Sequence, residues 1–122
     1  NFTEYNNSGH VLLDGTLGKN VQDFRTYLSP WNGQPTGAPS AVASPGSGGT
    51  ISVSVSWNGA TQVASWQVLA GASTGALSPV ATATKTAAFQ TTVSVPSAGP
   101  YVAVQALNSA GAVIGTSATI RD

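Results

Sequence analysis

The stretch Tyr101-Val-Ala-Val-Gln-Ala-Leu-Asn-Ser-Ala-Gly111 predicts a β-strand followed by a turn, because apolar residues fill its first part and turn formers close it. Two earlier stretches, Ser52-Val-Ser-Val-Ser-Trp57 and Ala64-Ser-Trp-Gln-Val68, alternate apolar and polar residues. A period of two is typical of strands that bury one face. We therefore expect an all-β fold whose core these stretches build.

Further strand-length runs follow at the spacing of a β-sandwich, with turn formers between them roughly every 8 to 12 residues. Ile51, Val53, Val55 and Trp57 are expected to face one side of their strand. Trp66 is expected at the centre of the core, where one indole buries roughly 200 Å². The remaining expected strands are residues 80–84, 89–95, 101–107 and 113–120.

The N-terminal part differs in composition, because residues 1–35 hold most of the charged side chains. The segments 2–5 and 11–13 flank the turn formers Asn6-Asn-Ser-Gly9, which predicts a β-hairpin. We therefore divide the chain into an N-terminal extension, residues 1–35, and a β-sandwich, residues 36–122.

Residues 21–28 are ambiguous. Val21, Phe24 and Leu28 have helical spacing, whereas the aromatic and Thr content of the segment favours a strand, and we predict the strand. Residues 31–39 carry Gly or Pro at nearly every second position, so they cannot continue a ladder and should connect the extension to the sandwich.

The composition argues against several classes of partner. Only 7% of the 122 residues are charged and the formal net charge is zero, so nucleic acid and membrane surfaces are not expected to bind. The chain contains no cysteine, which removes disulfides and thiolate metal sites.

No catalytic constellation is recognisable, so we expect neither enzymatic activity nor a cofactor. The acids Glu4, Asp14 and Asp23 form no recognisable acid/base pair, and the single histidine, His10, falls in the predicted hairpin turn. We interpret His10 as a solvated turn residue, with a binding or pH-sensing role as the alternative. Metal binding would need clustered His, Cys or acidic ligands, which the sequence lacks.

Secretion is the expected localisation. The chain begins at Asn1 without an initiator Met, as in a processed protein or an excised domain. Asn1-Phe-Thr3 and Asn6-Asn-Ser8 both match the N-glycosylation triplet, which predicts glycans at Asn1 and Asn6.

The segment from Tyr101 to Gly111 resembles the fibronectin type III pattern, in which a corner tyrosine opens one strand and an Asn and a Gly close the next turn. The preceding Val93-Ser-Val-Pro-Ser-Ala-Gly-Pro100 resembles the crossing that such a tyrosine ties down through its hydroxyl. This resemblance covers residues 38–122 and implies a fibronectin type III-like, or immunoglobulin-like, sandwich.

A narrower resemblance covers almost the whole chain. Phe2-Thr-Glu-Tyr5, Pro30-Trp-Asn-Gly33, Ser56-Trp-Asn-Gly-Ala-Thr61 and Trp66-Gln-Val-Leu-Ala-Gly71 are similar to the C-terminal end of fungal arylsulfotransferase-like proteins. That family implies a β-propeller followed by a small β-sandwich, with a propeller histidine as the sulfate-carrying nucleophile. The resemblance implies at most part of a terminal blade here, residues 2–28, so the active site is expected to be absent.

Aromatic side chains outside the predicted core are the candidate ligand-binding residues. Tyr5, Tyr27 and Trp31 lie in or beside the charged region together with Arg25, and aromatic faces rimmed by polar groups bind sugars or partner surfaces. The alternative is that these rings pack the hairpin onto the sandwich or onto a second subunit. We predict a homodimer formed through residues 1–35.

Two functions are therefore open. The first is a non-enzymatic secreted fungal recognition protein, a lectin-like or immunomodulatory β-sandwich that binds glycans or cell-surface receptors. The second is a non-catalytic C-terminal accessory domain, or processed fragment, of an arylsulfotransferase-like protein.

Overall fold

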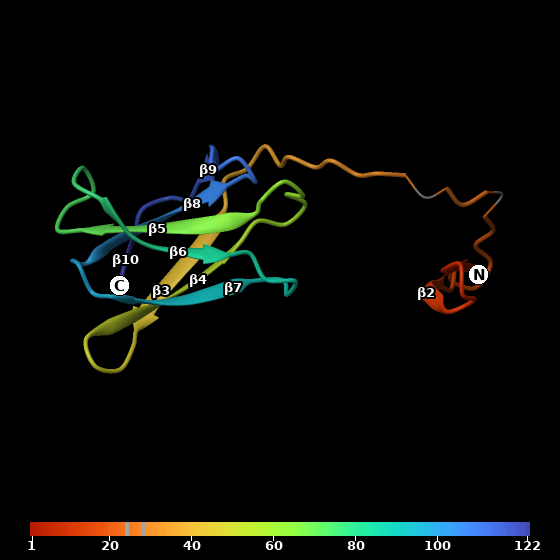
Figure 1. The fold of residues 1–122 in the computed structure, drawn as a ribbon, viewed down its shortest axis with the longest axis horizontal. Helices are drawn as coiled ribbons and strands as arrows, with labels where there is room; N and C mark the ends of the chain where they lie inside the picture. The colour runs from red at the N-terminus through yellow and green to blue at the C-terminus, as the bar shows by residue number, and fades with distance from the viewer. Residues whose placement is uncertain (24, 28) are drawn as a thin grey trace. The chain divides into compact units, whose positions relative to one another are not determined.

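A computed structural model describes residues 1–23, 25–27 and 29–122 of the chain. It divides into two compact units, Asn1–Pro30 and Trp31–Asp122. The ribbon in Figure 1 follows both units from the N-terminus to the C-terminus. No helix occurs in the described residues, and therefore none that could span a membrane.

The first unit contains the predicted hairpin. Strand β1 (Phe2–Tyr5) pairs antiparallel with β2 (Val11–Gly15). The turn is closed by its own side chain: Asn6 Oδ1 accepts hydrogen bonds from the backbone N–H groups of Ser8 and His10, both at 2.9 Å. Gly9 adopts a φ of 77°, which a residue with a Cβ adopts less readily.

The predicted strand over residues 21–28 is wrong for the part that the structure describes, because residues 21–23 and 25–27 are not in a strand. Asp23 accounts for the difference. Its carboxylate accepts hydrogen bonds from the Arg25 backbone N–H, at 3.2 Å, and from the Thr26 hydroxyl. Such local side-chain bonds compete with a ladder. Phe24 and Leu28 lie outside the described residues.

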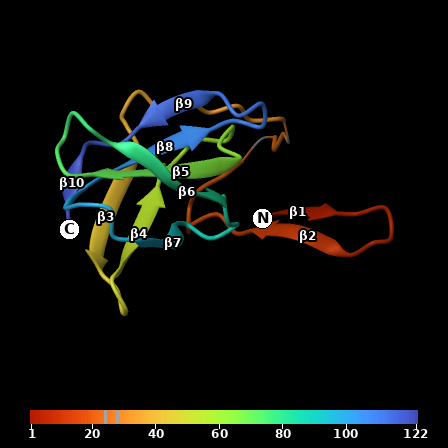
Figure 2. The ribbon, with the colours of Figure 1, turned by 60° about the vertical axis from the view of Figure 1, so that its left-hand side comes forward.

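The second unit is built from two antiparallel sheets, which Figure 2 shows from the side. One sheet has the order β3 (Ser40–Pro45), β4 (Thr50–Ser56), β7 (Thr91–Pro96). The other has the order β10 (Ile120–Arg121), β8 (Tyr101–Leu107), β5 (Ser65–Gly71), β6 (Ser78–Thr84), and β9 (Val113–Thr116) also pairs with β8.

One hydrophobic cluster joins the two sheets. Strand β4 contributes Ile51, Val53 and Val55 from alternate positions, as predicted, and β5 contributes Trp66 and Val68. Trp66 is only 2% exposed, which confirms its predicted central place. The all-β sandwich is thereby confirmed, whereas its fibronectin type III-like identity stays a prediction.

Two predicted strand boundaries differ from the structure. Strand β7 begins at Thr91 instead of Phe89. The reason is that Thr86 closes the preceding loop: its backbone N–H donates to Thr91 Oγ1 at 3.1 Å, and its hydroxyl donates to the Gln90 carbonyl at 3.0 Å. Phe89 therefore lies in a loop.

The predicted strand 113–120 is divided into β9 and β10 at Ser117. The Ser117 hydroxyl accepts a hydrogen bond from the Val104 backbone N–H and donates one to the Ala118 carbonyl, both at 2.9 Å. A side chain thus replaces a backbone partner of β8 at this point.

The Pro/Gly-rich connector contains no strand and packs closely against the turn after β4. Gly33 and Thr61 exchange hydrogen bonds, from Gly33 N–H to Thr61 Oγ1 at 2.9 Å and from Thr61 N–H to the Gly33 carbonyl at 3.1 Å. The Trp57 indole N–H donates to the Gly37 carbonyl at 2.7 Å. These bonds fix the position of the turn that follows Trp57.

Candidate ligand-binding site

The four candidate residues from the sequence are distributed over both units. Arg25 and Tyr27 are brought together, since Arg25 Nη1 donates to the Tyr27 hydroxyl at 3.2 Å. Tyr5 and Tyr27 are exposed in the first unit. Trp31 is exposed too, but it belongs to the second unit.

Tyr27 lines a pocket of about 440 Å³ in the first unit, together with Thr26 and residues of both hairpin strands, Phe2, Thr3, Glu4 and Leu13. Tyr5 and Arg25 are not among the described residues that line this pocket. Of the four predicted ligand-binding residues, Tyr27 is therefore the one that lines this pocket.

The predicted glycosylation residues Asn1 and Asn6 are both exposed in the first unit. The side-chain oxygen of Asn6 is bonded to the hairpin turn.

A different pocket, of about 290 Å³, opens at one end of the sandwich. Strands β4 and β6 end there, and β5 and β7 begin there, because Ser65 of β5 pairs with Thr84 of β6 and Val55 of β4 pairs with Thr91 of β7. We call it the Trp66 pocket. Its described lining consists of Val55, Trp57, Asn58, Gly59, Ala60, Thr61, Trp66, Lys85, Ala88, Phe89 and Thr91.

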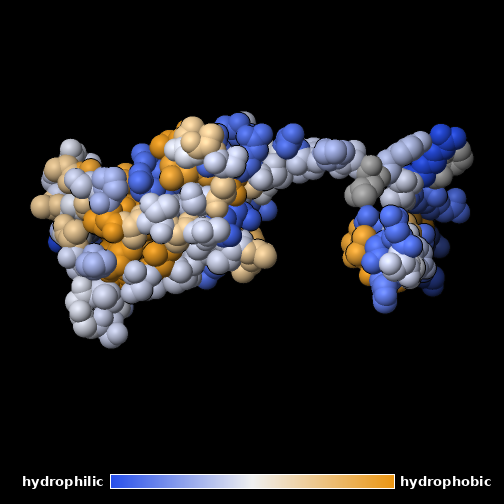
Figure 3. All heavy atoms as spheres, viewed as in Figure 1, coloured by the Kyte–Doolittle hydropathy of each residue, from blue (hydrophilic) through white to orange (hydrophobic). Residues whose placement is uncertain are grey.

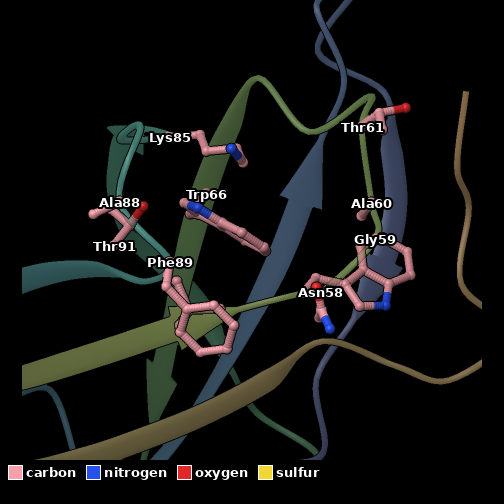
Figure 4. Close-up of a pocket in the computed structure, with 11 residues that line it drawn as sticks. Asn58, Gly59, Ala60, Thr61, Trp66, Lys85, Ala88, Phe89 and Thr91 are labelled. Carbon is pink, nitrogen blue, oxygen red and sulfur yellow. The ribbon is translucent and has the colours of Figure 1, made fainter. Parts of the chain in front are cut away.

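Two loops form opposite sides of the Trp66 pocket. Figure 4 shows residues 58–61 on one side and residues 85–91 on the other, with the Trp66 indole between them. The first loop is a tight turn, closed by a hydrogen bond from the Ala60 N–H to the Trp57 carbonyl at 3.2 Å. Gly59 has a φ of 82° in this turn.

Phe89 is the most exposed ring at this end of the sandwich, with 78% of its surface accessible. The sequence predicts a strand over residues 89–95, which gives no sign that Phe89 is a ligand contact. Its ring stands in the loop before β7, on the same side of the pocket as Lys85 (Figure 4). An exposed aromatic ring beside a pocket with several polar groups is typical of a small-molecule site.

The Trp66 indole nitrogen is a buried polar atom in the lining of the pocket. It has no hydrogen-bond partner among the described residues. Figure 4 shows the nitrogen-bearing edge of the ring directed toward the loop of residues 85–91. A buried N–H without an acceptor costs about 1–3 kcal/mol, so it calls for a specific explanation.

Lys85 is the charged residue among the described lining, which includes no acidic side chain. Its backbone is fixed by a hydrogen bond from its N–H to the Ala64 carbonyl at 3.0 Å. The exposed ammonium group makes a long contact with the Thr86 carbonyl, at 3.4 Å. The pocket therefore combines a fixed Lys backbone with a side chain that can turn toward a ligand.

A second pocket, of about 310 Å³, adjoins the first. The two share Trp57, Asn58 and Phe89. The second, which we call the Pro35 pocket, is lined by uncharged residues, among them Pro35, Gly37 and Ser40. We refer to both pockets together as the Phe89 site.

The Phe89 site combines aromatic rings with polar side chains, among them Asn58 and Lys85. No cluster of three His, Cys, Asp or Glu side chains that could hold a metal ion occurs in the described part of the chain. Much of the sandwich surface in the view of Figure 3 has intermediate hydropathy, with hydrophobic patches between. The arrangement is suited to hydroxyl-rich ligands that also present an apolar face.

The sequence offered little signal for this site. Phe89 follows the short, small-residue run Thr86-Ala-Ala88, which has no turn-forming Gly, Pro or Asn to mark a loop. Trp57 and Trp66 face inward, as predicted, but their common pocket depends on the packing of two loops that are distant in sequence.

Comparisons of the chain with known protein families, with curated proteins and with solved structures found no match. The resemblance to fungal arylsulfotransferase-like proteins accordingly stays a prediction.

Proposed function

We propose that the chain is a non-enzymatic, secreted recognition protein that binds glycans through the Phe89 site. The observation that carries the proposal is the exposed ring of Phe89 at the border of two adjoining pockets. One face of a sugar ring consists of C–H groups and stacks on an aromatic ring, while its hydroxyls need polar partners.

The polar partners are supplied by both loops. Asn58 offers a side-chain amide from one side, and Lys85 offers three N–H donors from the other. Two pockets that meet at one ring fit a ligand made of consecutive rings, as in an oligosaccharide. The predicted glycosylation triplets at Asn1 and Asn6 support a secreted protein.

The proposal is tested by a glycan array probed with the full chain, followed by calorimetry on the best ligand. Phe89→Ala should weaken binding at least tenfold. Trp31→Ala is the matched control, because Trp31 is 75% exposed and Phe89 78%, and Trp31 does not line the Phe89 site in the described structure. The control should change binding less than twofold.

Two results would contradict the proposal. Absence of binding to every glycan on the array would remove the function itself. Loss of binding in Trp31→Ala or Tyr27→Ala, with Phe89→Ala unaffected, would move the site to the residues that the sequence analysis favoured.

A further inference from the structure

We propose that the glycan is acidic, and that the Trp66 pocket holds the sugar that carries the negative charge. The inference rests on the proposed glycan-binding function and specifies its ligand. It depends on the kinds of hydrogen-bonding group that the pocket presents.

Two side chains of the Trp66 pocket, Trp66 and Lys85, are pure hydrogen-bond donors. An indole N–H and a lysine ammonium donate hydrogen bonds and cannot accept them. Among residues 1–23, 25–27 and 29–122 the Trp66 N–H finds no acceptor, and the Lys85 ammonium makes a 3.4 Å contact with the Thr86 carbonyl. The hydroxyl of the neighbouring Thr91 is bonded to the backbone N–H and the hydroxyl of Thr86, and it makes no bond to the indole N–H in the described structure.

A group that only accepts hydrogen bonds would complement these donors. Carboxylates and sulfate esters have this property, and hydrogen bonds to a charged acceptor are about twice as strong as neutral ones. A hydroxyl of a neutral sugar brings a donor with each acceptor, and the described lining provides no carboxylate to receive it. The balance of donors therefore favours an anionic group.

The position of Lys85 makes this contact possible. The Trp66 nitrogen is buried, so a ligand oxygen reaches it only when the adjoining loop moves outward. Residues 85–90 are all exposed, and the indole nitrogen is directed toward this loop (Figure 4). Lys85 lies at the start of the loop, and its flexible side chain can bring the anion toward the indole.

The Pro35 pocket takes the neighbouring sugar. It shares Trp57, Asn58 and Phe89 with the charged pocket, and its described lining is uncharged. Its volume of about 310 Å³ is close to the 290 Å³ of the Trp66 pocket, so each pocket fits one ring. The expected ligand is an oligosaccharide in which an acidic sugar is linked to a neutral or acidic one.

The experiment uses the full chain and three disaccharides with the same linkage: a uronic acid form, a sulfated form, and the neutral form with a primary alcohol in place of the carboxylate. Calorimetry at about 20 mM salt should give at least tenfold tighter binding for an acidic form than for the neutral one. The comparison of the two acidic forms identifies which anion the pocket takes. About 0.5 M salt should reduce the preference, because screening weakens exposed charge pairs.

Two variants separate the pocket from the overall charge of the protein. Lys85→Gln should abolish the preference for the acidic form. Arg121→Gln also removes one positive charge, but from β10, outside the Phe89 site, and this variant should keep the preference for the acidic form. The indole ¹H–¹⁵N signal of Trp66 should shift when the acidic form binds and shift much less with the neutral one.

Each contrary result has a separate meaning. Equal binding of the acidic and neutral forms would overturn this inference and leave the glycan-binding function standing. Binding of none of the sugars, together with a blank array, would overturn both. Equal losses in Lys85→Gln and Arg121→Gln would show that the preference reflects net charge, and would also overturn the inference.

Discussion

Replacing Trp66 by alanine and by phenylalanine should have unequal effects on stability, because the indole contributes a large buried ring and one unpaired donor. The ring is 98% buried, and truncating such a ring to alanine costs about 3–5 kcal/mol. The same substitution removes the buried N–H, whose burial without a partner costs about 1–3 kcal/mol. We expect a net loss of about 2 kcal/mol for Trp66→Ala, which is the difference between the middle values of the two ranges.

Trp66→Phe keeps most of the ring and removes the unpaired N–H. The stability lost with the smaller ring and the stability gained by removing the unpaired donor should nearly cancel. We therefore expect the free energy of unfolding to stay within about 1 kcal/mol of the wild type. Urea denaturation followed by circular dichroism measures both variants, with the slope against urea concentration checked for constancy.

Two outcomes would refute the reasoning about Trp66. A loss above about 3 kcal/mol in Trp66→Phe would mean that the indole N–H has a partner in the folded protein. A loss below about 1 kcal/mol in Trp66→Ala would mean that the ring is exposed and that β5 is shifted by one residue.

Two further predictions concern the connector and the first unit. Gly33→Ala should lower the free energy of unfolding by about 1–3 kcal/mol in thermal unfolding, because a Cβ there would lie 2.2 Å from the Gly59 carbonyl oxygen. Gly37→Ala is the control: nothing lies within 4 Å of a Cβ there, so its free energy of unfolding should be within about 0.5 kcal/mol of the wild type. Equal effects of the two substitutions would contradict the close packing of the connector. The full chain should form a dimer through residues 1–35 and sediment as a dimer at micromolar concentration, because both faces of the hairpin expose apolar side chains. Leu12→Glu should make the chain monomeric, since Leu12 is 60% exposed. A wild-type chain that sediments as a monomer at all concentrations would exclude the dimer.

The parts of the fold that depend on local chemistry could be predicted from the sequence. The hairpin follows from turn formers whose own side chains and φ preferences close the turn, as Asn6 and Gly9 do. The core strands can be predicted from the alternation of apolar and polar residues. This alternation buries Val53 and Val55 regardless of which strands pair with β4.

The parts that depend on single side-chain hydrogen bonds could not be predicted. Asp23 and Thr86 each form local hydrogen bonds that keep their segments from joining a β-sheet, although the composition around them is typical of a strand. The candidate site was missed for the same reason, because Phe89 is a ligand candidate only once Thr86 has closed the loop before β7. Tertiary context decides such positions, and propensity does not.

The break at Ser117 has a consequence for how the last strand opens. Its hydroxyl anchors the chain to Val104 from the middle of β8, whereas β10 beyond it is a ladder of two residue pairs, Ile120 with Val102 and Arg121 with Tyr101. Fraying that begins at β10 breaks these two pairs, the hydrogen bond from the Asp122 N–H to the Pro100 carbonyl, and the contact of Ile120 with the core before it reaches Ser117. Amide hydrogens of β10 should exchange with solvent well before those of β8, and the core can stay closed while this strand opens and closes.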